Sequence, residues 1–178
     1  LKADSEDVWS WSLRHIKIDD FNWNDEDFNF TKLRGLLRGD PFFLEAFKME
    51  LDRPGVPYLS TRLRLDTDKI EKHINTFVKS PVSGPATLDA TVSGEADDLN
   101  GIAKIIGSDL DYQGMKIQTL QADIQQEQDG ALSLNRLEAE LKEGRIVGHG
   151  LWRFEDGYAN LSVFVDDVPL KRLPVSIP

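Results

Sequence analysis

The sequence predicts a mainly β protein: an elongated, curled antiparallel sheet, shaped as an open β-trough or taco, with two similar strand blocks and one short helix. Two observations lead to this fold class. Apolar and polar residues alternate in many short runs, which is the period of a strand with one buried face. A strand-pair pattern also occurs twice in the chain, which is typical of a repeating architecture rather than of a compact enzyme.

The repeated pattern covers two strands and the turn between them. The first copy has Asp20-Phe21-Asn22-Trp23 before a polar turn, and the second has Asp109-Leu110-Asp111-Tyr112 before Gln113-Gly114. The matching apolar positions after the turn are Phe28, Phe30 and Leu33 in the first copy and Met115, Ile117 and Leu120 in the second. We therefore expect strand block one over 13–66 and strand block two over 82–166, in one continuous sheet in which 13–66 and 102–166 superpose.

Four of the alternating runs contain one step of three residues before the alternation resumes. These steps run from Phe30 to Leu33, from Leu44 to Phe47, from Ile117 to Leu120 and from Leu134 to Leu137. A β-bulge supplies one extra residue, which bends the strand and returns the apolar side chains to their face. A short helical turn would give the same spacing, but the occurrence of the step in both copies favours the bulge.

One helix is expected between the two blocks, over residues 67–80. Asp68 and Glu71 stand at capping-box spacing, and Pro81 ends the segment. His73 lies on this helix, where we expect a solvated side chain. The apolar stripe of the helix comprises Ile70, Ile74, Phe77 and Val78.

The composition is that of a chain able to bury a core, with 40% hydrophobic and 29% charged residues among 178. A net charge of −10 argues against a nucleic-acid partner and against adhesion to anionic bilayers. There is no cysteine, and no run approaches the ~18 apolar residues of a membrane span. Because the chain opens on Leu1 without an initiator Met, we expect 1–178 to be a fragment of a longer repeat-β protein, with 167–178 starting its next segment.

The sequence predicts no catalytic residue, no cofactor and no metal. The histidines at 15, 73 and 149 are isolated, without a second ligand at metal spacing. Residues 20–24 are similar to the start of a calcium loop, but Asp25 replaces the required glycine and Thr31 the closing Glu, so turn and cap roles are favoured. Since no nucleophile, base and orienting group come together, we do not expect an enzyme.

The second block carries a family resemblance. The run from Val82 to Gly94, followed by Gly107-Ser108-Asp109-Leu110-Asp111-Tyr112-Gln113-Gly114, resembles the AsmA-like family, and within it the TamB group. TamB proteins are the inner-membrane component of the translocation and assembly module. The segments 132–141 and 144–150 are also similar to the strand, turn and glycine signature of that family. The likeness covers 82–165 well and 13–66 as a degenerate copy, where Pro54-Gly55-Val56-Pro57 replaces the glycine run.

The resemblance implies a location and a function. Such proteins are anchored in the inner membrane of diderm bacteria, reach across the periplasm, and form a curled sheet whose apolar inside is implicated in moving phospholipids toward the outer membrane. The implied partners are phospholipid acyl chains and, through regions outside this fragment, an outer-membrane β-barrel. The residues expected to line the lipid groove are Phe28, Phe30, Leu33, Met115, Ile117, Leu120, Leu132, Leu134 and Leu137.

A second class of function stays open on the residues alone. The same apolar positions would serve a non-catalytic periplasmic β scaffold or protein-binding module whose apolar face is closed by a second sheet of its own. The aromatic side chains would then fill a closed core instead of lining a groove. An open apolar face should expose more than the ~300–600 Å² that is typical of the largest patch on a monomer.

Overall fold

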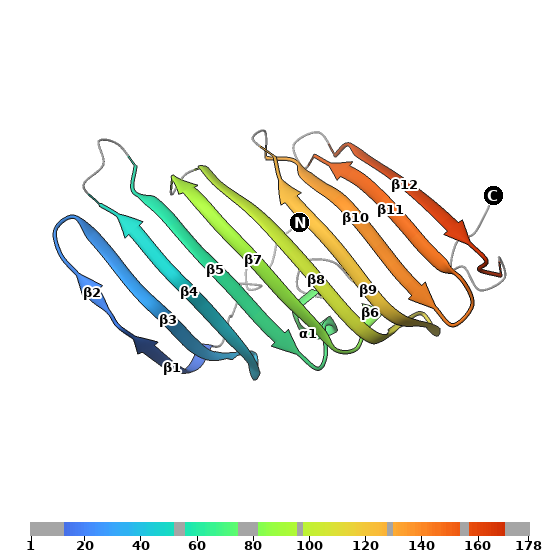
Figure 1. Ribbon diagram of the computed structural model, residues 1–178, viewed down its shortest axis with the longest axis horizontal. Coiled ribbons are helices and arrows are strands. Elements are labelled where there is room, and N and C mark those ends of the chain that lie inside the picture. Colours follow the sequence, from blue (N-terminus) through green and yellow to red (C-terminus); the bar gives the residue numbers. More distant parts are fainter. Residues whose placement is uncertain are drawn as a thin grey trace, which may run out of the picture.

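The computed structural model describes residues 13–51, 56–74, 82–95, 98–127, 130–153 and 157–169. These residues form a single antiparallel sheet of twelve strands with one short helix (Figure 1). The two outermost strands are not paired to each other, so the sheet is open rather than closed into a barrel. The predicted fold class, mainly β with one continuous antiparallel sheet, is therefore confirmed.

The strands follow one another across the sheet in chain order. The main path comprises β1 (Leu13–Asp19), β3 (Asp27–Leu37), β4 (Asp40–Glu50), β5 (Tyr58–Thr67), β7 (Ala86–Glu95), β8 (Asp98–Tyr112), β9 (Met115–Gln126), β10 (Leu132–Leu141), β11 (Arg145–Trp152) and β12 (Ala159–Asp166). Two short strands lie beside this path: β2 (Asn22–Trp23) pairs with β3, and β6 (Val82–Ser83) pairs with β8. The helix α1 (Glu71–Ile74) lies in the connection between β5 and β7.

Two-residue turns close two of the hairpins in the sheet. Arg38 and Gly39 join β3 to β4 with φ of 53° and 93°, and Gln113 and Gly114 join β8 to β9 with φ of 52° and 85°. Positive φ at both central residues is the requirement of the type I′ hairpin turn, whose twist matches that of the strands. The predicted turn at Gln113-Gly114 is thus confirmed.

The register places one continuous set of apolar residues on the same face of the sheet. Side chains directly opposite each other in an antiparallel pair point to the same face, so a row can be followed from strand to strand. One such row consists of Ile18, Leu33, Leu44, Leu63, Ala90, Ala103, Ile124, Leu134, Gly150 and Leu161. We call this the inner face and the opposite one the outer face.

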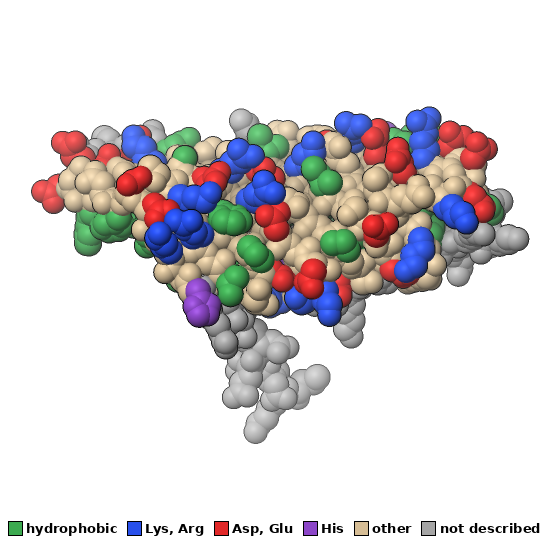
Figure 2. Space-filling view, turned by 60° about the horizontal axis from the view of Figure 1, so that its bottom comes forward, with side chains coloured by type: hydrophobic (Ala, Val, Ile, Leu, Met, Phe, Trp, Pro, Cys, Tyr) green, Lys and Arg blue, Asp and Glu red, His purple; other side chains and the backbone are tan. Residues whose placement is uncertain are grey.

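The outer face is polar and charged. Its rows bring Lys32 opposite Glu45 with an N–O distance of 2.9 Å, and Arg64, Asp89, Lys104, Asp123 and Arg136 follow one another on five successive strands. Figure 2 shows a face of the molecule on which basic and acidic side chains are interspersed, with single hydrophobic side chains between them over most of the sheet. These exposed pairs contribute little stability each, but they keep one side of the sheet in water.

The predicted bulges keep the inner face apolar. Register shifts occur in β4 between Glu45 and Lys48, in β10 between Leu134 and Leu137, and in β9 opposite Glu140 and Leu141, at the predicted three-residue steps. The step from Phe30 to Leu33 in β3 causes no shift against β4, because the Leu44-to-Phe47 step lies directly opposite it. Two matched steps thus leave the pairing in register while both strands turn their side chains back to the inner face.

The two blocks agree in their first hairpin and differ in the next strand. Trp23 lies opposite Phe28 as Tyr112 lies opposite Met115, and Asp20 and Asp109 have φ of 54° and 52° at matching positions. Leu33, however, faces Leu44, while its counterpart Leu120 faces Ala139. The cause is turn length, which sets register: a two-residue turn follows β3, while residues 127–131 separate β9 from β10.

The helix is shorter in the described residues than expected, and the turn before it is held by Thr67. The Thr67 hydroxyl accepts a hydrogen bond from Lys69 N–H at 3.0 Å, and the Glu71 carboxylate accepts one from Gly84 N–H at 3.1 Å. Glu71 therefore ties α1 to the start of β7 rather than acting as the expected capping-box partner of Asp68. The expected helical residues Phe77 and Val78, and Pro81, lie outside the described residues.

Gly107 provides a test of how tightly the inner face is packed. A Cβ at this position would lie 2.5 Å from Leu110 Cδ1, and Leu110 is only 1% exposed, so its side chain has no room to move away. We expect Gly107→Ala to lower the free energy of unfolding by about 1–3 kcal/mol, the cost of overpacking a core. Gly101→Ala on the same strand is the control, since its Cβ would meet nothing closer than 3.7 Å. Equal urea midpoints for the two variants would show that β8 is loosely packed here.

Candidate functional site

The nine residues predicted to line a groove all lie on the inner face of the sheet. Phe28, Phe30 and Leu33 of β3 are opposite Met49, Phe47 and Leu44, and the remaining six lie on the neighbouring strands β9 and β10. The structure therefore separates them into two groups, with β4, β5, β7 and β8 between the groups. Every strand between them also presents apolar side chains to the inner face, so one surface connects both groups.

The nine residues differ in exposure. Phe30 and Ile117 are buried at 6% and 7%, whereas Leu132, Leu134 and Leu137 are half-buried. A charge at Ile117 would therefore disrupt a packed core, while one at Leu134 would test an accessible surface. That lipid contacts these residues stays a prediction.

The inner face is exposed at its β12 edge. Leu161 is 60% exposed, and Val163 and Val165 beside it are also exposed. These residues alternate in the sequence as strand residues should, but their run lacks the three-residue step that occurs in the runs of the predicted groove residues. Edge position, which the sequence does not show, leaves their side chains uncovered.

An apolar hollow of about 370 Å³ lies over β9 to β12 on this face. Gly150 lies between Leu134 and Leu161 in the row, and the absence of a side chain there deepens the surface. A Cβ on Gly150 would approach the Asn160 carbonyl oxygen at 2.6 Å, so the position also requires glycine sterically. The apolar side chains of the inner face around the hollow are Ile124, Leu132, Leu134, Trp152, Ala159 and Leu161.

The other end of the inner face is covered. Ile70, beside α1, is 6% exposed and packs in one cluster with Ala86, Leu110, Ile117, Ala139 and Leu141. Val82 of β6 and Val168 after β12 pack against the same cluster. In Figure 1, α1 and β6 lie near the end of the sheet at which β8 turns into β9. The inner face is therefore closed at one end by chain segments and open at the other.

A buried carboxylate, Asp40, holds this cover to the sheet. Its Oδ2 accepts hydrogen bonds from the Thr67 hydroxyl at 2.6 Å and from His73 Nε2 at 2.8 Å, and Lys72 Nζ lies 3.2 Å from Oδ1. His73 is 10% exposed in its side chain, so the prediction of a solvated histidine is wrong. The reason is a partner 33 residues earlier in the chain, which no local pattern shows.

The same contacts set the charge state of Asp40. Burial by itself raises the pKa of this carboxyl, but hydrogen bonds from Thr67, His73 and Lys72 outweigh it and hold the pKa below the ordinary 3.8. Lys72 also binds Asp68 at 3.0 Å, and its pKa is raised by both carboxylates. Asp40 is consequently an ionised, fully partnered group at neutral pH, which suits a structural clamp.

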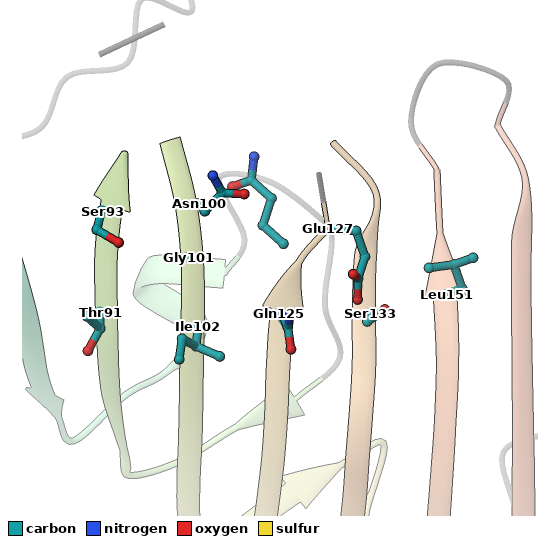
Figure 3. Close-up of a pocket in the computed structure, with 10 residues that line it drawn as sticks. Thr91, Ser93, Asn100, Gly101, Ile102, Gln125, Glu127, Ser133 and Leu151 are labelled. Carbon is teal, nitrogen blue, oxygen red and sulfur yellow. The ribbon is translucent and has the colours of Figure 1, made fainter. Parts of the chain in front are cut away.

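A second hollow, of about 780 Å³, lies on the outer face over β7 to β11 (Figure 3). Thr91, Ile102, Gln125, Ser133 and Leu151 form one row across it, and Ser93, Asn100 and Glu127 lie toward the end of the strands. Glu127 is the one ionisable group among its lining residues. The hollow therefore lacks the pair of titratable groups that acid–base catalysis needs and the cations that phosphate binding needs.

Comparison with known proteins finds no match to a family model, to a curated protein or to a solved structure. The resemblance to AsmA-like proteins therefore stays a prediction. In the part of the chain that the structure describes, no helix has the length and apolar character to cross a membrane. Nor do the described residues bring together three His, Asp or Glu side chains able to hold a metal ion.

The Asp40 clamp predicts a specific pH dependence of stability. Because its pKa is lower in the folded chain than in the unfolded one, the stabilisation is present above pH 3.8 and is lost as the pH falls through the folded value. At pH 7, Asp40→Asn should lower the free energy of unfolding by about 1.5–3 kcal/mol, and the difference should shrink below about pH 4. The control is Asp68→Asn, which removes an exposed partner of the same lysine and should change stability by at most about 0.5 kcal/mol. A pH-independent difference between wild type and Asp40→Asn, measured by urea unfolding, would contradict the clamp.

Proposed function

We propose that this chain is a segment of an AsmA- and TamB-like, periplasm-spanning protein whose apolar inner face shields phospholipid acyl chains during transport between the inner and outer membranes. The observation that carries the proposal is an apolar face continuous over ten strands and uncovered at the Leu132 and Leu161 end of β9 to β12. Anchoring in the inner membrane and a β-barrel partner in the outer membrane belong to the same proposal, through regions beyond these residues.

The chemistry of the face suits an acyl chain. Hydrocarbon makes no hydrogen bonds, so a surface of leucine, isoleucine, valine and glycine needs no polar group to bind it. Each CH₂ removed from water contributes about 0.8 kcal/mol to the free energy of binding. The ten residues of β10 span roughly 33 Å at about 3.3 Å per residue. Half of a ~30 Å hydrocarbon core is roughly 15 Å, so an acyl chain fits along a single strand with room to move.

The scaffold alternative rests on a closed apolar face. It predicts a second sheet over the inner face, and the described residues form one sheet only. The cover near Ile70 closes part of the face, but Leu161 at 60% exposure lies beyond it. Exposed apolar edges are costly in a protein that uses its face only as a core, which favours a surface made for a mobile apolar ligand.

A paired substitution on β12 tests the proposal. Leu161 points to the inner face and Ser162 to the outer one, so Leu161→Arg and Ser162→Arg place the same charge on opposite sides of one strand. Phospholipid that copurifies with the wild-type chain from a diderm host, detected by native mass spectrometry and lipid extraction, should fall at least about tenfold in Leu161→Arg. The reason is the cost of about 2.5–3.5 kcal/mol for an arginine in hydrocarbon, where 1.4 kcal/mol corresponds to tenfold.

The control result is retention of lipid by Ser162→Arg, with unchanged circular dichroism for both variants. Leu161 is exposed already, so its substitution is not expected to unfold the chain. The absence of phospholipid from the wild type, or its equal retention in both variants, would refute the lipid-shielding function. That result would favour the alternative, a non-catalytic β scaffold or protein-binding module with a closed core.

A further inference from the structure

Five aromatic residues cluster at the corner of the inner face farthest from β12. We call the cluster Phe21, Trp23, Phe28, Phe30 and Phe47 the aromatic corner; it belongs to β2, β3, β4 and the residue before β2. Phe30 and Phe47 stack with ring centres 4.7 Å apart and planes 5° from parallel. Phe28 packs edge-on against both rings, and Phe21 edge-on against Phe28 at 5.3 Å. The rings therefore hold one another in a fixed arrangement.

The aromatic corner runs from a buried anchor to an exposed tip. Phe30 is 6% exposed, Phe28 and Phe47 are half-buried, and Phe21 and Trp23 are 54% and 70% exposed. Trp23 is the most exposed large hydrophobic side chain among the described residues. It stands directly opposite Phe28 in the register, beside the strand that carries the packed rings. An exposed tryptophan next to a packed aromatic base has the composition of an interface hot spot.

Acidic residues flank this tip in the sequence. Residues 18–31 contain five acidic residues and no basic one. Asp19 is paired with Arg34 at 2.7 Å, but Asp20, Asp25 and Glu26 are exposed and form no ion pair with another described residue. The tip thus combines an uncovered apolar ring with carboxylates that lack a cationic partner in the described part of the chain.

The acidic turn is held in place by its own hydrogen bonds. Asn24 Oδ1 accepts from the backbone N–H groups of Glu26 and Asp27, both at 2.8 Å, and Asn24 N–H donates to the Asp27 carbonyl at 3.0 Å. Leu51 N–H donates to the Glu26 carbonyl at 2.7 Å, which ties the turn to the end of β4. Because the backbone of the turn is held in place before binding, a ligand would lose little free energy in ordering the turn.

We propose that the aromatic corner is a docking site for a cationic segment of another protein, with an apolar side chain on Trp23 and lysines or arginines on Asp20, Asp25 and Glu26. Charge complementarity decides the occupant. Lipid head groups that carry phosphate would be repelled by three carboxylates, and a neutral protein surface would bury those carboxylates unpaired. A guanidinium or ammonium group pairs with them and also stacks favourably on the tryptophan face.

The two ends of the inner face therefore have different partners. The described residues next to Leu161 in the register, Leu151, Gly150 and His149 on β11 and Asn160 and Ser162 on β12, include no carboxylate. The β12 end suits a lipid chain, and the aromatic corner suits a protein. The docking proposal stands independently of lipid binding, because none of its residues lines the hollow over β9 to β12.

The test uses the full 178-residue chain and two fluorescent peptides of equal length. The first alternates leucine with lysine and arginine, and the second replaces every basic residue by glutamate. Fluorescence anisotropy should show binding of the basic peptide alone. Trp23→Ala should weaken its binding about tenfold, and the isosteric double change Asp25→Asn with Glu26→Gln should weaken it several-fold and reduce its salt dependence.

Matched variants separate this site from general attraction to an acidic protein. Leu161→Ala removes an exposed apolar group elsewhere on the inner face, and Asp98→Asn with Asp109→Asn removes two exposed charges elsewhere. Both should leave peptide affinity unchanged within a factor of two, and Trp23→Phe should restore most of the loss in Trp23→Ala. Equal weakening by the control variants, binding of the acidic peptide, or Trp23-dependent binding to phosphatidylglycerol vesicles would each overturn the proposal.

Discussion

The structure depends on one constraint: apolar side chains must stay on the same face across a sheet that bends. A strand alternates its side chains with period two, so an extra residue without a bulge would move every later apolar group to the outer face. The chain meets this constraint with bulges. Some face a step on the neighbouring strand and leave the register unchanged, as where the Phe30-to-Leu33 step faces the Leu44-to-Phe47 step, and others shift the register, as at Leu134 to Leu137. The continuous inner face follows from these bulges.

The constraint also explains why the two faces have such different roles. Charged rows on the outer face keep that side of the sheet in water, while the exposure of the apolar inner face differs from one part of the sheet to another. Segments around Ile70 cover one end and are clamped by Asp40, an exposed apolar edge follows at β12, and the rigid aromatic corner stands at the opposite side. The sheet thus presents a covered end, an open apolar stretch and an aromatic corner flanked by acidic residues, and the proposals of an apolar ligand and of a protein partner rest on the last two.

The fold class and most bulges were predictable because both depend on local patterns. Alternation and three-residue steps are read within about ten residues, and they placed Leu134 and Leu137 on the correct face. The Asp40–His73 contact was not predictable, since it joins residues 33 apart and is made only when the connection folds over the sheet. The register after Leu33 and after Leu120 differs through turn length, and the exposure of Leu161 follows from its edge position; neither has a signature in residue type.

The central claim, an inner face that is open at the Leu134 and Leu161 end of β9 to β12 and closed near Ile70, can be measured directly because the chain contains no cysteine. Single cysteines introduced as Leu161→Cys, Leu134→Cys and Ile117→Cys can be reacted with a maleimide under native conditions. The structure predicts that the cysteine at 161 reacts nearly as fast as in unfolded protein and that the one at 134 reacts more slowly. The cysteine at 117, 7% exposed in the native leucine-rich cluster, should be protected by a factor that approaches the unfolding equilibrium. Equal, strong protection at all three positions would show a closed core and contradict the open face.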